Sequence, residues 1–301
     1  MTVPHVAHTV EELNRLLAEL DEQTEHTERT DSAGGLAHRA VVMTMGALHA
    51  GHMELVDRAR AAARQVVVTV FVNPLQFGPG EDYEAYPRVL DADVALLAEH
   101  GADIVFAPER EDMYPGGDPL VRVTSGHLGT ILEGSFRPGH FDGVLTVVNK
   151  LMHLVRPQLA FFGEKDAQQL LLIERMVKDF NLDVEIRPVP IVRQEDGLAL
   201  SSRNSYLSEE ERVTALTLSR ALEAARDAAE QGSNGPEARE AAVAVFAEQP
   251  QVVLDYLVIV DPQTITDVTN DYAGKALALV AARVGTTRLI DNMHVEIAAR
   301  A

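Results

Sequence analysis

Two histidines three positions apart, His49 and His52, follow a β-branched run that stops at Gly46. An apolar-periodic segment begins directly after them, so the stretch predicts a strand, a glycine turn and a helix start. The first turn of a helix carries backbone N–H groups without intrahelical acceptors, which suits an anion. Both imidazoles would lie on the same side of that turn and could reach a phosphate there. The stretch therefore indicates a nucleotide site. The alternatives are a structural turn with exposed histidines and a metal pair, for which the spacing marks no third ligand.

A second polar cluster lies at residues 71–77, where a strand ends before Pro74. The side-chain amides of Asn73 and Gln76 both donate and accept hydrogen bonds, which suits a small polyhydroxy acid. A turn whose amides satisfy each other is the structural alternative. The Gly78-Pro-Gly80 sequence that follows is typical of a mobile flap.

Residues 161–169 repeat the order of apolar strand, glycine and helix start. Lys165 supplies a compact cation, Asp166 a carboxylate able to accept ribose hydroxyls, and Gln169 lies one turn further on. An ordinary helix N-terminus also carries acidic residues, but a lysine is less expected there, which favours phosphate. Further along, residues 201–203 place two hydroxyls beside a guanidinium, a dense set of anion donors whose structural alternative is a surface loop or a helix cap.

Six segments in order resemble the pantothenate synthetase, or pantoate–β-alanine ligase, family over residues 40–292. They read Met-Gly-Ala-Leu-His-x-Gly-His from 45, Phe-Val-Asn-Pro-x-Gln-Phe from 71, Tyr-Pro-Arg from 86, Arg-Pro-x-His-Phe-x-Gly-Val from 137, Phe-Gly-Glu-Lys-Asp from 162 and Leu-Ser-Ser-Arg-Asn from 200. The histidine pair resembles the HIGH signature of the nucleotidylyl-transferase superfamily. The Ser-Ser-Arg segment occupies the place of that superfamily's KMSKS loop.

The resemblance implies ATP-dependent condensation of pantoate with β-alanine through an enzyme-bound pantoyl adenylate, with release of pyrophosphate and AMP. The residues that it implies for catalysis are His52, the family's usual proton donor, with His49, Lys165, Ser202 and Arg203. The implied ATP-binding set is Met45, Gly46, Ala47, Leu48, His49, Ala50, Gly51, His52, Gly163, Glu164, Lys165, Asp166, Val192, Leu200, Ser201, Ser202 and Arg203. Within that set Gly163 and Asp166 would meet the ribose, while Val192 and Leu200 would flank the adenosine.

Three amides, Asn73, Gln76 and Gln169, are implied to hold pantoate, with Gln76 also near β-alanine. No residue is assigned as a metal ligand, because Mg²⁺ would arrive on the ATP phosphates and keep its waters. The chain departs from the family pattern at Met43, where the family usually has Pro, and at Ala167, where it usually has an aromatic residue. The acidic segment 21–35 resembles an insertion beyond the family core.

Strand and helix patterns alternate from residue 40 onward. Strands are predicted at 40–44, 66–72, 103–107, 158–162 and 184–189, and helices at 51–64, 91–100, 141–155 and 166–180. Near-continuous apolar strands that alternate with helices predict an α/β fold with a Rossmann-like, doubly wound parallel sheet in residues 1–191. A helix at 10–20 precedes it, followed by a loop at 21–35. Two helices and then strands at 252–260, 276–284 and 287–292 predict a smaller α+β domain in residues 192–301.

Composition narrows the class of partner. The 301 residues carry a formal charge of −20 and include no cysteine, with 46% hydrophobic and 24% charged residues. The charge disfavours nucleic-acid binding, and the lack of cysteine excludes disulfides and thiolate chemistry. No stretch approaches the roughly 18 apolar residues of a membrane span, and no signal-peptide pattern opens the chain. We expect a cytoplasmic enzyme of small-molecule substrates, and the resemblance implies a homodimer.

Two other classes fit part of the pattern. A nucleotidylyl-transferase with a different acceptor, such as an aminoacyl-tRNA synthetase, would share the histidine pair, but the acidic charge argues against a tRNA partner. A non-catalytic nucleotide-binding module would keep the phosphate clusters without needing the amides.

Overall fold

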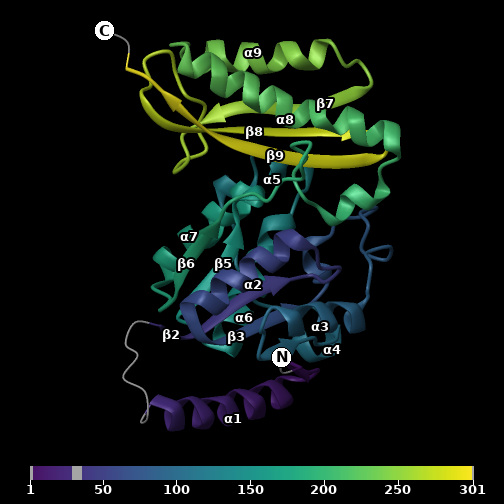
Figure 1. The fold of residues 1–301 in the computed structure, drawn as a ribbon, viewed down its shortest axis with the longest axis vertical. Helices are drawn as coiled ribbons and strands as arrows, with labels where there is room; N and C mark the ends of the chain where they lie inside the picture. Colours follow the sequence, from purple (N-terminus) through teal and green to yellow (C-terminus); the bar gives the residue numbers. More distant parts are fainter. Residues whose placement is uncertain (1–2, 29–35, 300–301) are drawn as a thin grey trace. The chain divides into compact units, whose positions relative to one another are not determined.

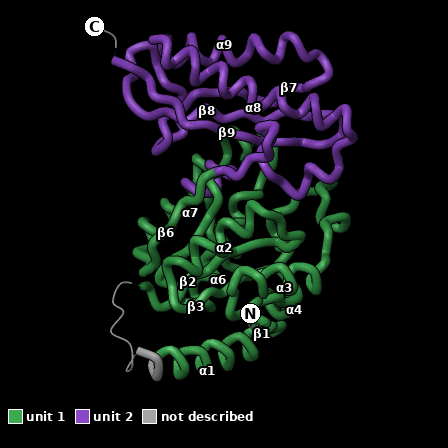
Figure 2. The backbone as a smooth tube through the Cα atoms, in the orientation of Figure 1, with its two compact units in different colours: residues 1–164, 172–190 green, residues 165–171, 191–301 purple. Residues whose placement is uncertain are grey.

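The computed structural model describes residues 3–28 and 36–299, and these residues form two compact units (Figures 1 and 2). Unit 1 comprises residues 1–164 and 172–190, and unit 2 comprises residues 165–171 and 191–301. The segment 165–171, which the sequence analysis placed with the first domain, thus belongs to the second unit.

Unit 1 contains a six-stranded sheet in which all strand pairs are parallel, in the order β1-β4-β3-β2-β5-β6. The strands are β1 (His5–Ala7), β2 (Ala37–Thr44), β3 (Ala63–Val70), β4 (Ile104–Phe106), β5 (Leu159–Gly163) and β6 (Glu185–Val189). The chain winds outward from β2 through β3 to β4, and then returns to the other side of β2 as β5 and β6. This order confirms the predicted doubly wound fold.

The helices of the parallel sheet connect successive strands. They are α1 (Val10–Glu28), α2 (Ala50–Ala62), α3 (Leu90–Glu99), α4 (Arg110–Met113), α5 (Glu133–Phe136), α6 (His140–Val155) and α7 (Ala167–Phe180), with 3-10 turns at Pro74–Gln76, His127–Gly129 and Glu164–Asp166. Met53, Val56 and Ala59 recur at helical spacing along α2 and are buried against the valines of β2 and β3. Parallel sheets covered in this way bind ligands beyond the carboxyl ends of their strands, where the winding reverses. Here that point lies between β2 and β5.

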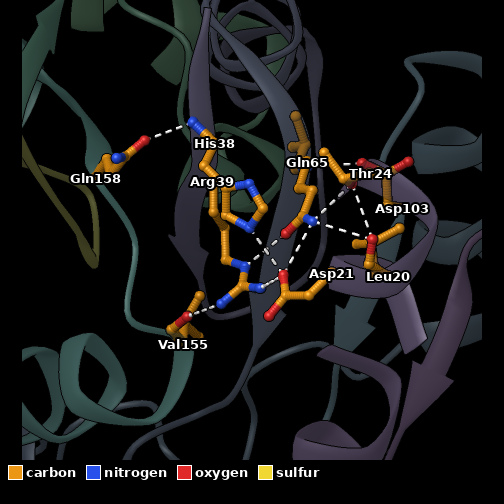
Figure 3. Close-up of polar contacts among 10 residues, drawn as sticks. Leu20, Asp21, Thr24, His38, Arg39, Gln65, Asp103, Val155 and Gln158 are labelled. Atoms are coloured by element: carbon orange, nitrogen blue, oxygen red, sulfur yellow. Dashed lines mark hydrogen bonds and ion pairs between the residues drawn. The ribbon is translucent and has the colours of Figure 1, made fainter. Parts of the chain in front are cut away.

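The predicted loop from residue 21 is wrong up to Glu28, because α1 continues to that residue. Figure 3 shows the cause. Asp21, on α1, receives hydrogen bonds from Arg39 on β2 and from Gln65 on β3, the latter at 3.1 Å, and Thr24 accepts a further bond from Gln65 at 2.8 Å. These contacts anchor the polar half of the helix at the amino ends of two strands. Residues 29–35 of the predicted loop lie outside the described residues.

The three-residue strand β1 is an element that the sequence analysis missed. It pairs with β4, also three residues long, through the register Val6↔Val105. Strands this short carry too little periodicity to stand out, and a neighbouring strand is needed to define them.

Unit 2 contains an antiparallel sheet in the order β7-β8-β9, formed by β7 (Val252–Val260), β8 (Gly274–Val284) and β9 (Thr287–Ile297). Two helices, α8 (Glu209–Glu230) and α9 (Gly235–Ala247), contribute alanines and leucines to a core that they share with the strands. Each helix begins with a capping box, Ser208 with Glu211 and Asn234 with Glu237. The predicted α+β character of this region is confirmed.

Candidate functional site

The turn that leaves β2 is held by a carboxylate from α3. Gly46 and Ala47 have φ values of 86° and 50°, so both adopt left-handed backbone. Asp93, only 3% exposed, accepts the N–H of Ala47 through Oδ2 at 3.0 Å and the N–H of Leu48 through Oδ1 at 2.8 Å. Burial raises the pKa of Asp93, although the two backbone hydrogen bonds oppose this shift. The expectation of open N–H donors is therefore wrong at these two positions, where Asp93 already occupies the donors.

The two imidazoles of the turn occupy two more backbone donors. His49 is the N-cap of α2, and its Nδ1 accepts the N–H of Gly51 at 3.1 Å. His52 accepts the N–H of His49 on Nδ1 at 3.3 Å, and the ring centroids lie 4.1 Å apart. A neutral imidazole that accepts on Nδ1 carries its proton on Nε2. In this arrangement each imidazole stabilises the turn through Nδ1 and carries its own donor on Nε2.

Asn73 is a buried amide whose polar atoms are all engaged inside the protein. The residue is only 1% exposed. Its Oδ1 accepts a hydrogen bond from the Tyr114 hydroxyl at 2.9 Å. Its Nδ2 donates to Gln76 Oε1 and to the Gly143 carbonyl, both at 3.1 Å. Burial, with the nearby charge of Asp118, raises the pKa of Tyr114, so its hydroxyl remains a donor. Asn73 therefore orients Gln76, and its own amide has no unused donor to offer pantoate.

Gln76 ends the 3-10 turn after β3 and lies beside the histidine turn. Its Nε2 donates to Met45 Sδ at 2.8 Å, and its main-chain carbonyl accepts from His140 Nδ1 at the same distance. A thioether is a weak acceptor, and an amide nitrogen carries two hydrogens, so Nε2 keeps donor capacity for a ligand. The structure thus brings Met45, Asn73 and Gln76 together at the carboxyl ends of β2 and β3.

The flap that follows Gln76 is tied to the loop before α6. Arg137 donates from Nε to Glu81 Oε1 at 2.8 Å and from Nη2 to Oε2 at 2.7 Å, which makes a bidentate pair. Burial raises the pKa of Glu81, but the hydrogen bonds and charge of Arg137 outweigh it and leave that pKa below its usual value. The contacts of Arg137 and His140 are to Glu81 and to the Gln76 main chain.

Lys165, Asp166 and Gln169 lie in the first segment of unit 2, residues 165–171. Lys165 has a side chain 22% exposed, its Nζ lies 3.8 Å from Asp166 Oδ1, and its main-chain oxygen accepts from Asn292 Nδ2 at 2.9 Å. Among the described residues, the Gln169 amide on α7 makes no hydrogen bond. A partly exposed ammonium and an amide with unused capacity on one short segment suit a ligand that is both anionic and polar. Gly163 and Glu164, which precede this segment, belong to unit 1.

A short antiparallel turn of unit 2 precedes the segment of Ser201, Ser202 and Arg203. Leu200 N donates to the Val192 carbonyl at 3.0 Å, so the two residues implied to flank adenosine are adjacent. Ser201 caps a 3-10 turn, Ser202–Tyr206, by accepting the N–H of Arg203 at 3.3 Å. The cap leaves the Ser202 hydroxyl and the Arg203 guanidinium on the same short turn.

The two departures from the family pattern fall at element boundaries. Met43 is the next-to-last residue of β2, partly buried and paired with Thr69. Ala167 is the first residue of α7. In the described ranges there is no cluster of three or more His, Asp or Glu side chains suited to a metal ion. No helix of that same part of the chain is both long and apolar enough to cross a membrane.

Sequence reasoning missed four side chains that shape these clusters: Asp93, Tyr114, Asp291 and Asn292. Asp93 lies on an acidic helix start and Tyr114 after a short helix, so nothing local distinguishes them. The signal that could have marked Asp291 is a charged residue in a register that Leu289, Met293, Val295 and Ile297 otherwise fill with apolar side chains, and Asn292 follows it directly.

Known proteins with related sequences and structures identify the family of this chain. A family model described as pantoate-beta-alanine ligase matches residues 6–294. A pantothenate synthetase from Streptomyces avermitilis is 50% identical, and the alignment covers 87% of this chain and 93% of the relative. One from Thermobifida fusca is 54% identical over 272 residues, covering 87% and 91%.

Two solved structures are similar over nearly the whole chain. The pantothenate synthetase from Thermus thermophilus superimposes with a TM-score of 0.86 at 49% identity, covering 96% of this chain and 98% of that one. The pantoate-beta-alanine ligase from Francisella tularensis, complexed with beta-gamma ATP and beta-alanine, gives a TM-score of 0.73 at 33% identity, covering 96% and 97%. By its sequence, its fold and its matched motifs, this chain belongs to the pantoate-beta-alanine ligase family of ATP-binding enzymes in pantothenate biosynthesis.

Proposed function

We propose that this chain condenses (R)-pantoate with β-alanine in two steps. A pantoate carboxylate oxygen attacks the α-phosphorus of ATP, and pyrophosphate leaves, giving a pantoyl adenylate. The β-alanine amine then attacks the acyl carbon, loses a proton, and displaces AMP to give pantothenate. Adenylation is needed because a carboxylate is a poor acyl donor, whereas AMP is a good leaving group.

The observation that carries this proposal is the placement of Gln76 beside the histidine turn in unit 1. Gln76 is 8% exposed, its amide oxygen is held by Asn73, and its amide nitrogen reaches Met45 of the turn at 2.8 Å. An oriented amide beside two imidazole donors matches a substrate with a hydroxyl and a carboxylate that reacts at a phosphate. A simple nucleotide-binding module would have no use for the amide.

The residues support electrostatic and positional catalysis rather than a covalent nucleophile. In unit 1 we propose that His49 and His52 donate from Nε2 to phosphoryl oxygens, with His52 the proton donor. In unit 2 we propose the same ligand for the Lys165 ammonium, the Ser202 hydroxyl and the Arg203 guanidinium, which stabilise charge that develops on departing pyrophosphate. Asn73 acts through Gln76, while Gln76 and Gln169 contact pantoate.

The remaining ATP contacts follow the family assignment. We propose that Gly163 and Asp166 meet the ribose and that Val192 and Leu200 flank the adenosine. The donor set is made of imidazole, ammonium, guanidinium and hydroxyl groups, which suits phosphate oxygens. Mg²⁺ would therefore be held by those phosphates and by water, as this ion prefers, and would neutralise triphosphate charge. A homodimer and a cytoplasmic location stay predictions of the resemblance.

Release of AMP, detected by coupled enzymes in the presence of ATP, pantoate and β-alanine, tests the proposal. We expect AMP only when pantoate is present. His49→Ala and Lys165→Ala should each lower turnover by about 10²-fold or more, since each removes a donor to the reacting phosphates. The matched controls are His153→Ala and Lys178→Ala, which alter exposed residues of α6 and α7 and should leave turnover near wild type.

Exchange of pyrophosphate into ATP distinguishes the acceptors. Exchange that depends on pantoate, without β-alanine, supports an adenylate of pantoate. Exchange that depends on an amino acid instead would identify a different acceptor, and ATP binding without any turnover would identify a non-catalytic module. Near-normal turnover in both site variants would overturn the site assignment.

A further inference from the structure

Two consecutive residues of β9, Asp291 and Asn292, contact two separate candidate ATP-binding segments of unit 2. Asp291 accepts two hydrogen bonds from the Arg193 guanidinium, on Oδ2 from Nη1 at 2.7 Å and on Oδ1 from Nη2 at 2.9 Å. The same guanidinium donates to the main-chain oxygens of Gly197 and Asn292, both at 3.1 Å. Arg193 therefore fixes the base of the turn that carries the Ser-Ser-Arg segment.

The side chain of Asn292 holds the other segment by a hydrogen bond to the main chain of Lys165. Its Nδ2 donates to the Lys165 carbonyl at 2.9 Å, and the residue is only 2% exposed. This bond fixes the backbone from which the Lys165 side chain extends, without involving the ammonium itself. The Asn292 amide therefore fixes the position of the Lys165 backbone and leaves the charge of the Lys165 ammonium for a ligand.

The contacts of Asp291 with Arg193 and of Asn292 with Lys165 lie on opposite faces of the same strand, β9. Successive side chains of a strand point to opposite faces of the sheet. Asp291 pairs with Val280, which belongs to the core beneath α8 and α9, whereas Asn292 pairs with Leu279, which does not. One rigid strand in the sheet therefore holds the Arg193 turn on one face and the Lys165 backbone on the other.

The turn between Arg193 and the Ser-Ser-Arg segment can transmit this position. Leu200 pairs with Val192 through its N–H, and Asn204 donates from Nδ2 to the Ala199 carbonyl at 3.0 Å. These bonds lie on both sides of Ser201, Ser202 and Arg203 in the sequence. A displacement at Arg193 would therefore move the donors of that segment.

We propose that Asp291 and Asn292 are positioning residues that together fix the spacing between the Lys165 ammonium and the donors at Ser202 and Arg203. The inference rests on the proposed function, because it takes both segments to contact one ATP. Neither residue touches the nucleotide. Each acts through a segment that does, and the pair makes β9 the common reference for both.

Titration calorimetry with ATP tests the inference on the full chain. We expect Asn292→Ala and Asp291→Asn each to weaken ATP binding by about tenfold, the usual effect of losing one well-placed hydrogen bond. The matched control is Asp255→Asn. Asp255 accepts from Arg288 Nε at 2.7 Å in the same sheet, and that ion pair is as buried as the pair of Asp291 with Arg193. The control should lower the unfolding temperature similarly, with ATP affinity within about twofold of wild type.

Double-mutant cycles separate positioning from general loss of structure. Asn292→Ala should weaken ATP binding less than twofold when Lys165 is already alanine, because the side chain that it positions is gone. Asp291→Asn should likewise have little effect in an Arg203→Ala background. Full additivity in both cycles would show a merely structural role and overturn the inference.

Measurements on the wild-type protein test the proposed function separately from this inference. Wild-type protein that binds ATP, with Asn292→Ala and Asp291→Asn both unchanged in affinity, would refute the inference alone. Wild-type protein that binds ATP but forms no AMP with pantoate would refute the proposed reaction and leave these residues to be judged by affinity. Wild-type protein that binds no ATP would refute both.

Discussion

Gly143 of α6 is the position where one added methyl group should damage pantoate use far more than it damages the fold. A Cβ built on Gly143 would lie 2.1 Å from the Leu75 carbonyl oxygen and 2.7 Å from the Gln76 nitrogen, both main-chain atoms. Real Cβ atoms essentially never come closer than 3.0 Å, so Gly143→Ala must displace the turn that carries Gln76 by about 1 Å. The displacement also strains the bond from Asn73 to the Gly143 carbonyl.

The expected magnitudes differ for stability and for catalysis. Overpacking a core by one methyl group costs about 1–3 kcal/mol, and the better helix propensity of alanine returns roughly 1 kcal/mol. The net loss of about 0–2 kcal/mol leaves a domain of ordinary stability folded. A misplacement of about 1 Å in a substrate-orienting group costs about 10²-fold in rate, or roughly 2.7 kcal/mol. Gly143→Ala should therefore stay folded and lose about 10²-fold in kcat/KM for pantoate.

Gly235→Ala provides the matched control for this experiment. Its Cβ would lie 2.1 Å from Val268 Cγ2, a clash of the same closeness at the start of α9, far in the sequence from the amide cluster. Thermal unfolding should show a decrease for both variants. AMP release with varied pantoate should show kcat/KM for Gly235→Ala within about threefold of wild type, because a folded variant with intact amides keeps its orientation of substrate. Wild-type kcat/KM in Gly143→Ala, or equal losses in both variants, would refute the reasoning.

Three further substitutions probe the polar contacts of unit 1. Asp93→Ala leaves two backbone N–H groups without their acceptor and should lower the free energy of unfolding in urea by about 2–4 kcal/mol. Glu81→Gln should cost about 1 kcal/mol at pH 7. Because the pKa of Glu81 is lowered in the fold, this difference from wild type should persist above the ordinary carboxyl pKa and vanish as the pH falls through the lowered value, as urea titrations from pH 7 to 3 would show. Arg39→Met should destabilise by about 2–3 kcal/mol yet leave KM for ATP and pantoate unchanged, since the Asp21 contact lies at the amino ends of the strands; a changed KM would contradict that separation.

The winding of the parallel sheet was predictable because it depends on local pattern. Valine-rich runs that alternate with helix-periodic segments specify buried parallel strands wherever they occur. The extension of α1 to Glu28 was not predictable in the same way. Its polar side chains Asp21 and Thr24 gain partners from His38, Arg39 and Gln65, which lie on two later strands. Local composition indicated a loop, and tertiary contacts decided for the helix.

Motif recognition identified the residue types of the candidate clusters, but it could not say which of their polar atoms the fold would use. The histidine turn illustrates the difference. Its backbone N–H groups looked open because a helix start leaves such donors without partners. The acceptor that takes two of them is Asp93, more than forty residues later, on an acidic helix start like many others. A donor's availability is thus a property of the folded neighbourhood and not of the motif.

The three predicted pantoate amides are the same chemical group but differ in the hydrogen bonds that they make within the protein. Asn73 uses both of its side-chain atoms within the protein, Gln76 uses its oxygen and keeps donor capacity on nitrogen, and Gln169 makes no side-chain hydrogen bond among the described residues. A buried polar group that is fully satisfied gains nothing by exchanging a protein partner for a ligand, because each bond broken offsets the bond formed. The proposed function therefore assigns substrate affinity to Gln76 and Gln169, while Asn73 determines the direction in which Gln76 points. The sequence places all three amides in one class, and only the hydrogen-bond partners separate Asn73, which orients a neighbour, from the two amides that keep capacity for a ligand.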